Sequence, residues 1–327
     1  MATTTRRSFL GTVAGGTAAA TVGAWRPGRA RAATPVKVGC VVLGDLGVNA
    51  PTMIGIEKGF FKQNDLDAEM VPFKGGPDLL KGVLAGAADI GITGATDPLV
   101  FRERGTGIRA VATILEKNHF TLTVGPNVKK VEDLKGGSIG VTVVGSTTWV
   151  FARMLARKMG WEPEKDIKIV GVGGLDAQAA ALRRGETQAC IFGDAGAVLE
   201  AQGVGRILMR LDEVTPRWIS LIAYTTDDLL KTKKDTLRRT LRALFQGHKF
   251  FRDNADESIR IAAKGIGWPE SATRRAYDLV KPLLSVDGRM DLGAMKVMQD
   301  TLLELGLLKQ RLPLDQHYTT EFVPVKI

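Results

Sequence analysis

The sequence predicts an α/β protein built as two lobes of similar size. Three observations support this. Short apolar segments alternate with helical ones, the alternation falls into two consecutive units, and only helices follow the second unit. Alternating strands and helices are typical of parallel sheets that helices cover. A chain of 327 residues is long enough for two lobes, so we expect no third domain.

Residues 1–33 are predicted to be a twin-arginine signal peptide. Arg6 and Arg7 precede Ser-Phe-Leu, an apolar stretch of small residues follows, and a basic patch ends at Ala33. Paired arginines in this setting are typical of proteins exported in the folded state. The stretch is too short and too rich in Gly, Ala and Thr for a membrane anchor. We therefore expect a mature protein that is free in the periplasm.

The first unit is predicted as β-α-β-α-β-α-β, because apolar runs of strand length alternate with segments that open on Asp or Pro and close near Gly. The expected strands are Lys37 to Gly44, Ala68 to Phe73, Ala88 to Thr93 and Arg109 to Leu115. The expected helices are Pro51 to Lys58, Asp78 to Ala85 and Asp97 to Arg104.

The second unit repeats this alternation, and helices alone follow it. Its expected strands are His119 to Val124, Ser138 to Val143, Asp166 to Val172, Gln188 to Gly193 and Arg206 to Leu211. Its expected helices are Thr148 to Met159, Asp176 to Arg184 and Ala195 to Gln202. After a strand at Ile219 to Tyr224, helices are expected at Lys234 to Asp253, Asp256 to Lys264, Pro269 to Leu284 and Asp291 to Leu305.

Charge and composition argue against nucleic acid, metal and cofactor binding. Without the five signal arginines the net charge falls from +10 to about +5, with 40 basic against 35 acidic residues. The basic cluster Lys231 to Lys234 has acids nearby, which favours a solvated helix face. Cys40 and Cys190 lie in different units, and none of the three histidines has another metal ligand at suitable spacing.

Four strand-to-helix loops are rich in glycine and small hydroxyl residues. Such loops line the crevice of an α/β sheet, and the helix N-termini after them suit a carboxylate, sulfonate or phosphate. One helix end contributes about 0.3 to 2 kcal/mol, whereas micromolar affinity needs about 8 kcal/mol, so several ends, hydroxyls and an apolar wall are required. Each loop alone is equally explained as an ordinary turn. The loops are Gly44 to Asn49, Gly75 to Asp78, Thr93 to Thr96 and Gly145 to Thr148.

Short motifs in order along the chain resemble the nitrate/sulfonate/taurine substrate-binding proteins of ABC transporters. Individually the motifs are weak, but their order and spacing cover nearly all of the mature chain. They are Glu57 to Phe61, Val71 to Phe73, Gly75 to Asp78, Leu84 to Gly86, Ala88 to Gly94, Val131 to Gly136, Ile139 to Val141, Gly145 to Thr147, Arg183 to Glu186 and Ala189 to Phe192.

The resemblance implies a two-lobed type II periplasmic binding protein fold with a two-strand hinge and an all-helical C-terminal segment packed on lobe 1. The crossings are expected near Lys117 to Phe120 and Arg217 to Leu221. Lobe 1 then comprises residues 34–118 and 222–327, and lobe 2 comprises residues 119–221. Such a protein is a monomer that binds a small-molecule ligand and delivers it to an ABC permease, without a catalytic residue, cofactor or metal.

The resemblance also places the ligand contacts on the glycine-rich loops. Asp194, which replaces part of an aromatic-acidic pair frequent in the family, either contacts a ligand amine or hydroxyl or caps the helix that starts at Ala195. If it faces the ligand, a bare inorganic anion is disfavoured. Phe120, Trp218 and Tyr224 are either cleft wall or core. The expected ligand-binding residues are Asn49, Gly76, Gly94, Thr96, Ser146, Thr147, Thr148, Trp149 and Asp194.

The function predicted from these features is capture of a small organic anion, such as a sulfonate or carboxylate, by hinge closure. Two alternatives stay open. An enzyme resembling the desulfinase or pyrimidine synthase that share this fold would need Cys40 as its nucleophile, but its unit contains no histidine before His119 to lower the thiol pKa. A periplasmic sensor subunit would use the same capture.

Overall fold

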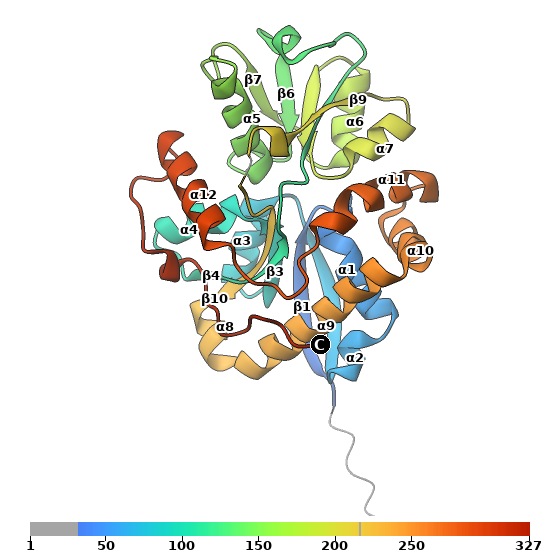
Figure 1. Ribbon diagram of the computed structural model, residues 1–327, viewed down its shortest axis with the longest axis vertical. Helices are drawn as coiled ribbons and strands as arrows, with labels where there is room; N and C mark the ends of the chain where they lie inside the picture. The colour runs from blue at the N-terminus through green and yellow to red at the C-terminus, as the bar shows by residue number, and fades with distance from the viewer. Residues whose placement is uncertain (1–31, 216) are drawn as a thin grey trace, which may run out of the picture. The chain divides into compact units, whose positions relative to one another are not determined.

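The computed structural model describes residues 32–215 and 217–327, and the predicted signal peptide lies almost entirely outside them. Within the described residues two separate five-stranded sheets carry helices on their faces (Figure 1). No helix in this part of the chain has both the length and the apolar character to cross a membrane. The mixed α/β architecture that the sequence predicts is therefore confirmed.

The first sheet has the strand order β2-β1-β3-β10-β4, and its helices define the first lobe with it. β1 runs parallel to β2 and β3, whereas β10 runs antiparallel between β3 and β4. The chain returns from the second lobe into β10, so β10 enters the first sheet from the end opposite to that of its neighbours. The elements are β1 (Thr34–Val41), α1 (Leu46–Glu57), α2 (Phe60–Gln63), β2 (Leu66–Phe73), α3 (Gly76–Leu84), β3 (Ile90–Gly94), α4 (Thr96–Glu103), β4 (Ile108–Leu115) and β10 (Leu221–Thr226).

The second sheet has the order β7-β6-β8-β5-β9 and forms the second lobe. β6 is parallel to β7 and β8, and β5, which arrives from the first lobe, is antiparallel to β8 and β9. One antiparallel strand in each sheet thus follows a crossing of the chain between the lobes. We propose that the second lobe comprises residues 119–221. The elements are β5 (Thr121–Val124), β6 (Ser138–Val141), α5 (Thr147–Lys158), β7 (Lys168–Gly171), α6 (Leu175–Arg183), β8 (Ala189–Phe192), α7 (Gly196–Ala201) and β9 (Arg206–Arg210).

The boundaries around the first strand and helix differ from the prediction. β1 ends at Val41 rather than Gly44, because Val42 adopts φ 37°, which breaks the extended conformation. α1 begins at Leu46 rather than Pro51, since the Asp45 side chain accepts a hydrogen bond from the Val48 backbone N–H and caps the helix. Most of the loop predicted at Gly44 to Asn49 is therefore helical.

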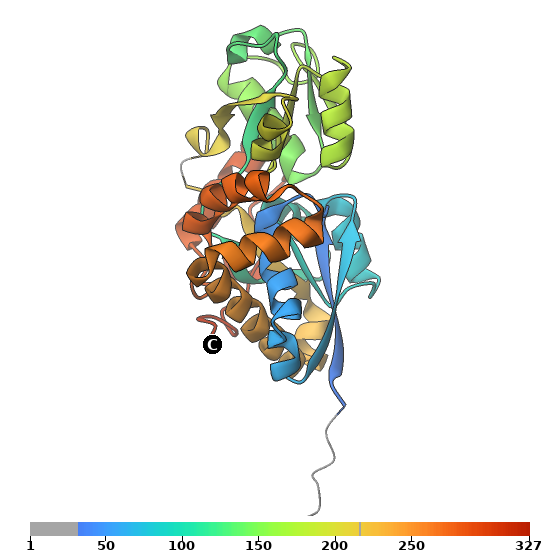
Figure 2. The same cartoon turned by 90° about the vertical axis from the view of Figure 1, so that its right-hand side faces the viewer.

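The helices after β10 pack on the first lobe, as predicted. α9 and α10 lie against α1 (Figure 2). The last two helices also reach the second lobe, because α11 contacts α7, and Met298 of α12 shares a buried cluster with Phe151 of α5. These elements are α8 (Asp227–Thr232), which the sequence did not predict, α9 (Lys234–Asp253), α10 (Ala255–Ile266), α11 (Glu270–Val280) and α12 (Leu292–Glu304).

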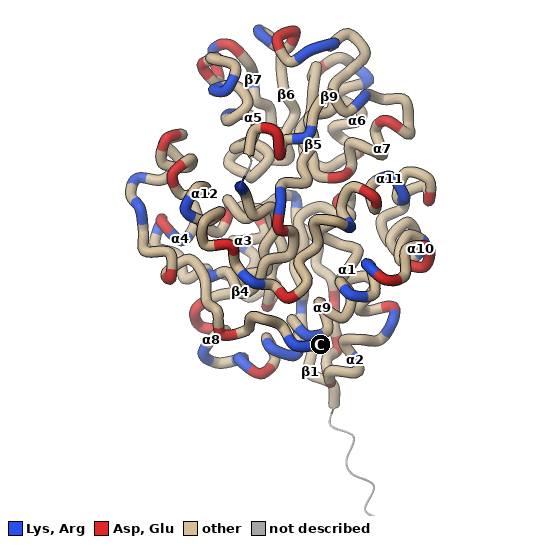
Figure 3. Tube along the Cα trace, in the orientation of Figure 1, with Lys and Arg blue, Asp and Glu red and all other residues tan. Residues whose placement is uncertain are grey.

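The basic segment at the start of α9 carries acidic partners. Lys234 pairs with Glu321, and Arg239 pairs with Asp235 on the same helix face. Figure 3 shows blue and red segments interspersed over the described chain. This arrangement supports the interpretation of the cluster as a solvated helix face.

Replacing Gly247 of α9 by alanine is expected to destabilise the fold by about 1 to 3 kcal/mol. An added Cβ would lie 2.2 Å from the Pro51 carbonyl oxygen of α1, and a backbone atom cannot move aside cheaply. Gly265→Ala in α10 is the matched control, because its Cβ would meet the flexible end of Met53 at 2.6 Å. Urea unfolding compares the variants, and equal midpoints would show that the α1–α9 crossing is not tightly packed.

Candidate functional site

A small cavity of about 30 Å³ lies between the two sheets. It is bounded by the carboxyl ends of β1, β3, β6 and β8, which is where ligands bind in open α/β sheets. Val42 and Thr142 also line a wider groove that opens beside it. The lining residues are Val41, Val42, Asp45, Val48, Gly75, Gly76, Thr93, Gly94, Asp97, Phe120, Thr142, Ser146, Thr147, Thr148, Phe192, Gly193 and Leu221.

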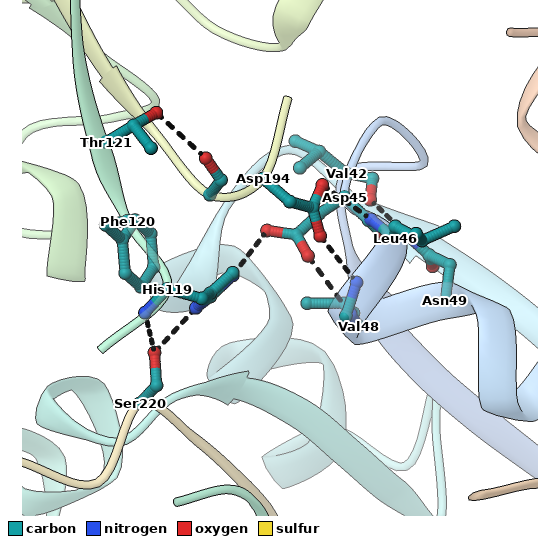
Figure 4. A network of polar contacts seen from close by, with 12 residues as sticks. Val42, Asp45, Leu46, Val48, Asn49, His119, Phe120, Thr121, Asp194 and Ser220 are labelled. Carbon is teal, nitrogen blue, oxygen red and sulfur yellow. Dashed lines mark hydrogen bonds and ion pairs between the residues drawn. The ribbon is translucent and has the colours of Figure 1, made fainter. Parts of the chain in front are cut away.

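Beside the cavity, Asp194 of the second lobe caps a helix of the first. Its Oδ1 accepts a hydrogen bond from the Leu46 backbone N–H at 3.0 Å, and its Oδ2 accepts one from Gly47 at 2.8 Å (Figure 4). Both donors belong to the first turn of α1. The predicted cap of α7 is wrong, because α7 has no side-chain cap; Asp194 instead caps α1 across the cleft, and its role as a ligand contact stays a prediction.

Asp97 makes the reciprocal contact from the first lobe to the second. Its Oδ1 accepts a hydrogen bond from Thr147 Oγ1 at 2.9 Å, and the Thr147 backbone N–H at the start of α5 also stabilises this carboxylate. Thr93 Oγ1 donates to Oδ2 at 2.9 Å. Thr96 hydrogen-bonds to Thr147 across the same boundary. We call the Asp194–α1 and Asp97–α5 contacts the two crossed caps.

A third polar network, formed by Asp45, His119 and Ser220, connects the cavity to the crossing segments. Asp45 Oδ2 lies 3.2 Å from His119 Nε2, and His119 Nδ1 lies 2.6 Å from Ser220 Oγ (Figure 4). His119 precedes β5 and Ser220 precedes β10, so the network joins both crossings to the N-terminus of α1. Only glycine fits at 193, because a Cβ there would lie 2.2 Å from Asp45 Oδ2 and 2.6 Å from His119 Nε2.

The carboxylates of the crossed caps are held in an unfavourable environment. Burial raises the pKa of Asp97 to about 6, although hydrogen bonds from the surrounding threonines lower it. Burial also raises the pKa of Asp194 well above its usual range, and the nearby Asp45 charge raises it further, while the N–H groups of Leu46 and Gly47 lower it. Burying these groups opposes folding, which points to a role in function.

The backbone before α1 is strained next to the cavity. Val42 adopts φ 37°, an outlier for a β-branched residue that costs about 1 to 3 kcal/mol. The Asn49 amide holds this loop, since Nδ2 contacts the carbonyl oxygens of Val42, Leu43 and Asp45 at 2.9, 3.0 and 2.7 Å. Asn49, predicted as a ligand contact, therefore has a positioning role on this geometry.

The structure brings most of the predicted site residues together. Gly76, Gly94, Ser146, Thr147 and Thr148 line the cavity. Thr96 and Asp194 border the cavity through their contacts between the lobes. Trp149 is not among the lining residues of the described chain; the Arg153 guanidinium carbon lies 4.7 Å from the centroid of its ring. Their roles as ligand contacts stay predictions.

The aromatic residues that the sequence left undecided separate into two groups. Phe120 lines the cavity, and Phe192, which was not predicted, lines it as well. Trp218 and Tyr224 are buried and belong to the hydrophobic core. One of the predicted wall residues thus reaches the site.

Sequence reasoning missed the acidic character of the site. Asp45 and Asp97 both line the cavity, and neither was selected. An aspartate at the start of a helix is the usual N-cap, so its type alone carries no functional signal. The available signal was that Asp45 stands in one glycine-rich cleft loop and Asp97 directly follows another.

One group of described residues could hold a metal ion. Asp45, His119 and Asp194 are buried and offer ligand atoms within 4.8 Å of one another. Each of their four carboxylate oxygens already has a partner, namely Val48, His119, Leu46 and Gly47. The geometry therefore favours a satisfied polar network over a metal centre.

Comparison with known proteins identifies similar chains. The family model described as NMT1/THI5 like matches residues 48–258. YtlA of Bacillus subtilis (strain 168), provisionally described as a binding protein, is 23% identical over 231 residues. That match spans 66% of this chain and 66% of YtlA.

Solved structures resemble the chain over most of its length. The alkanesulfonate-binding protein SsuA of Xanthomonas axonopodis pv. citri, bound to MOPS, is 18% identical with a TM-score of 0.75, covering 88% of this chain and 98% of that one. The periplasmic aliphatic sulphonate-binding protein SsuA of Escherichia coli is 19% identical with a TM-score of 0.71, with the same coverage. At these identities the likeness shows the periplasmic binding protein fold.

Proposed function

Because the chain belongs to the NMT1/THI5-like family, we propose that it is the solute-binding component of an ABC importer. The observation that carries the proposal is the cavity at the carboxyl ends of strands from both sheets, with polar contacts that cross it. The proposed protein acts in the periplasm after twin-arginine export, as a monomer that delivers its solute to a membrane permease.

Capture depends on closure of the two lobes about the crossing segments. In the closed arrangement the loops of both lobes surround the cavity, so a solute bound there contacts both at once. A solute that contacts both lobes stabilises the closed form relative to the open one. Closure then creates the surface, shared between the lobes, that a permease recognises.

The solute is small and organic on this proposal. Hydroxyl groups of Thr93, Thr142 and Ser146 face one part of the cavity, and Phe120 and Phe192 supply an apolar wall. The geometry does not favour the predicted organic anion, however. Of the four helix N-termini on which that prediction depended, those of α1 and α5 are occupied by Asp194 and Asp97.

Native mass spectrometry of protein purified without refolding tests the proposal. We expect a solute in the 1:1 complex that denaturation releases and that raises the melting temperature when restored. At a concentration of 100 times Kd the stabilisation is about 2.7 kcal/mol. An empty protein that no periplasmic extract stabilises would rule out solute capture.

The buried cysteines argue against the enzyme alternative. Burial raises the pKa of Cys40 to about 12, with the Asp45 charge adding to the effect, and burial raises the pKa of Cys190 to about 12. A reactive cysteine needs a thiolate near neutral pH. Cys40 Sγ contacts the Val71 carbonyl oxygen at 3.8 Å.

Neither thiol is therefore expected to react with a disulfide reagent at pH 8 while the protein is folded. The same protein in guanidinium chloride is the control, and there both thiols should react within minutes. Fast labelling of one thiol in the folded state would revive the nucleophile hypothesis.

A further inference from the structure

We propose that the solute is a small organic cation, a compound whose binding group is a protonated nitrogen. This inference rests on the proposed function, because it names the class of solute that the cavity between the two sheets takes. It is carried by the arrangement of charged and hydrogen-bonding groups around that cavity.

The cavity wall carries negative but no fixed positive side-chain charge. Asp45 and Asp97 line it, and no Lys or Arg of the described chain does so. Lys74 lines the wider groove outside the cavity. His119 is the titratable base beside Asp45, and both of its ring nitrogens are already engaged, by Asp45 and Ser220.

Two of the helix N-termini that would bind an anion, those of α1 and α5, are occupied. The first-turn N–H groups of α1 donate to Asp194 and Asp45, and the start of α5 faces Asp97. These are the groups with which a helix N-terminus recognises an anion. An anionic solute at either of these two helix ends would have to displace a carboxylate of the protein and would then lie beside it, whereas a cation does not displace the carboxylate.

Asp45 retains acceptor capacity, whereas Asp97 already accepts from Thr93, Thr96 and Thr147. An ionised carboxylate has about four lone-pair positions. Asp45 uses two of its positions, for the Val48 N–H and for His119. The cavity hydroxyls, such as Thr142, Ser146 and Thr148, are engaged with one another. An ammonium or amidinium group supplies the missing donors together with the compensating charge.

The apolar part of the wall suits the same ligand. Phe120 and Phe192 line the cavity, and an aromatic face attracts a cation more strongly when water is excluded. Gly76 leaves the room for this arrangement, since a Cβ there would lie 1.6 Å from Asp97 Oδ2. The structure thus combines carboxylates, hydroxyls and aromatic rings around one small space.

The test compares matched cations and anions on the mature, refolded and solute-free protein. Primary amines, guanidines and quaternary ammonium compounds are tested by thermal shift and calorimetry against carboxylates and sulfonates of the same carbon skeletons. We expect stabilisation by at least one cation and by none of the matched anions. Asp97→Asn should weaken binding of that cation at least tenfold. Asp45→Asn should do the same, and agreement between the two variants excludes a folding defect in one of them as the cause. The exposed Asp67→Asn is the control for net charge and should bind normally.

The outcomes separate this inference from the proposed function. A bound anion, whether from the panel or co-purified from cells, would overturn the cation assignment and leave solute capture standing. Binding of a cation that survives both Asp97→Asn and Asp45→Asn would overturn the assigned recognition groups. If neither the panel nor a cell extract stabilises the protein, both proposals fail.

Discussion

Replacing Asp97 by asparagine is expected to stabilise the solute-free protein at pH 7 by up to about 3 kcal/mol, while weakening solute binding at least tenfold. The rise of the Asp97 pKa from 3.8 to about 6 reflects a carboxylate that burial disfavours, and this difference corresponds to about 3 kcal/mol. Asparagine is nearly isosteric and keeps an acceptor for Thr147. A gain in stability with a loss of function is typical of a residue kept for its role in binding.

The pH dependence of stability gives the sign of the Asp97 contribution. Between about pH 4 and 6 the folded protein holds a proton on Asp97 that the unfolded chain has released. Its contribution to stability is therefore fully present below pH 3.8 and is lost as the pH rises through about 6. Guanidinium unfolding at pH 4 to 7 should show that the free energy of unfolding of Asp97→Asn rises relative to that of the parent protein as the pH increases. A constant difference between them would contradict the assignment.

Asp194→Ala is expected to weaken solute binding by about 30-fold, equivalent to about 2 kcal/mol. The change removes both acceptors for the Leu46 and Gly47 N–H groups, which are buried in this structure. Opening the lobes lets water satisfy these donors, so the open form gains relative to the closed one. Small-angle scattering should show a larger radius of gyration for the solute-free variant.

Asp194→Asn separates hydrogen bonding from charge. Its amide keeps one acceptor for the α1 N-terminus, and burial already disfavours the charge at this position. It should therefore retain more of the closed form than Asp194→Ala. Equal radii for the two variants and the parent protein would show that this cap does not control closure.

The sequence predicted the order of strands and helices well because strand-length apolar runs and glycine stops are local signals. It missed α2 and α8, since a helix of one or two turns is too short to show periodicity. The start of α1 was misplaced because Pro51 resembled a first-turn proline, whereas the cap is Asp45. Antiparallel β10 and β5 follow from the crossings, which alternation alone does not reveal.

The site was predicted in location but not in charge. The loops at Gly75 to Asp78 and Gly145 to Thr148 do line the cavity. The helix ends at the loops Gly44 to Asn49 and Gly145 to Thr148 were expected to be free, but Asp194 and Asp97 reach them from the other lobe, 147 or more and 50 residues away in sequence. Contacts over such separations depend on how the lobes meet, and no local pattern in one sequence carries that information.

The two crossed caps join the lobes through groups of the protein itself, so they favour the closed form independently of the solute. A permease that distinguishes only open from closed would then be engaged by idle molecules, and ATP would be hydrolysed without transport. The background rate of ATP hydrolysis in such a system is set by the equilibrium between the open and closed forms of the solute-free protein. Asp97 and Asp194 would in this way govern the energetic efficiency of uptake, separately from the affinity for the solute.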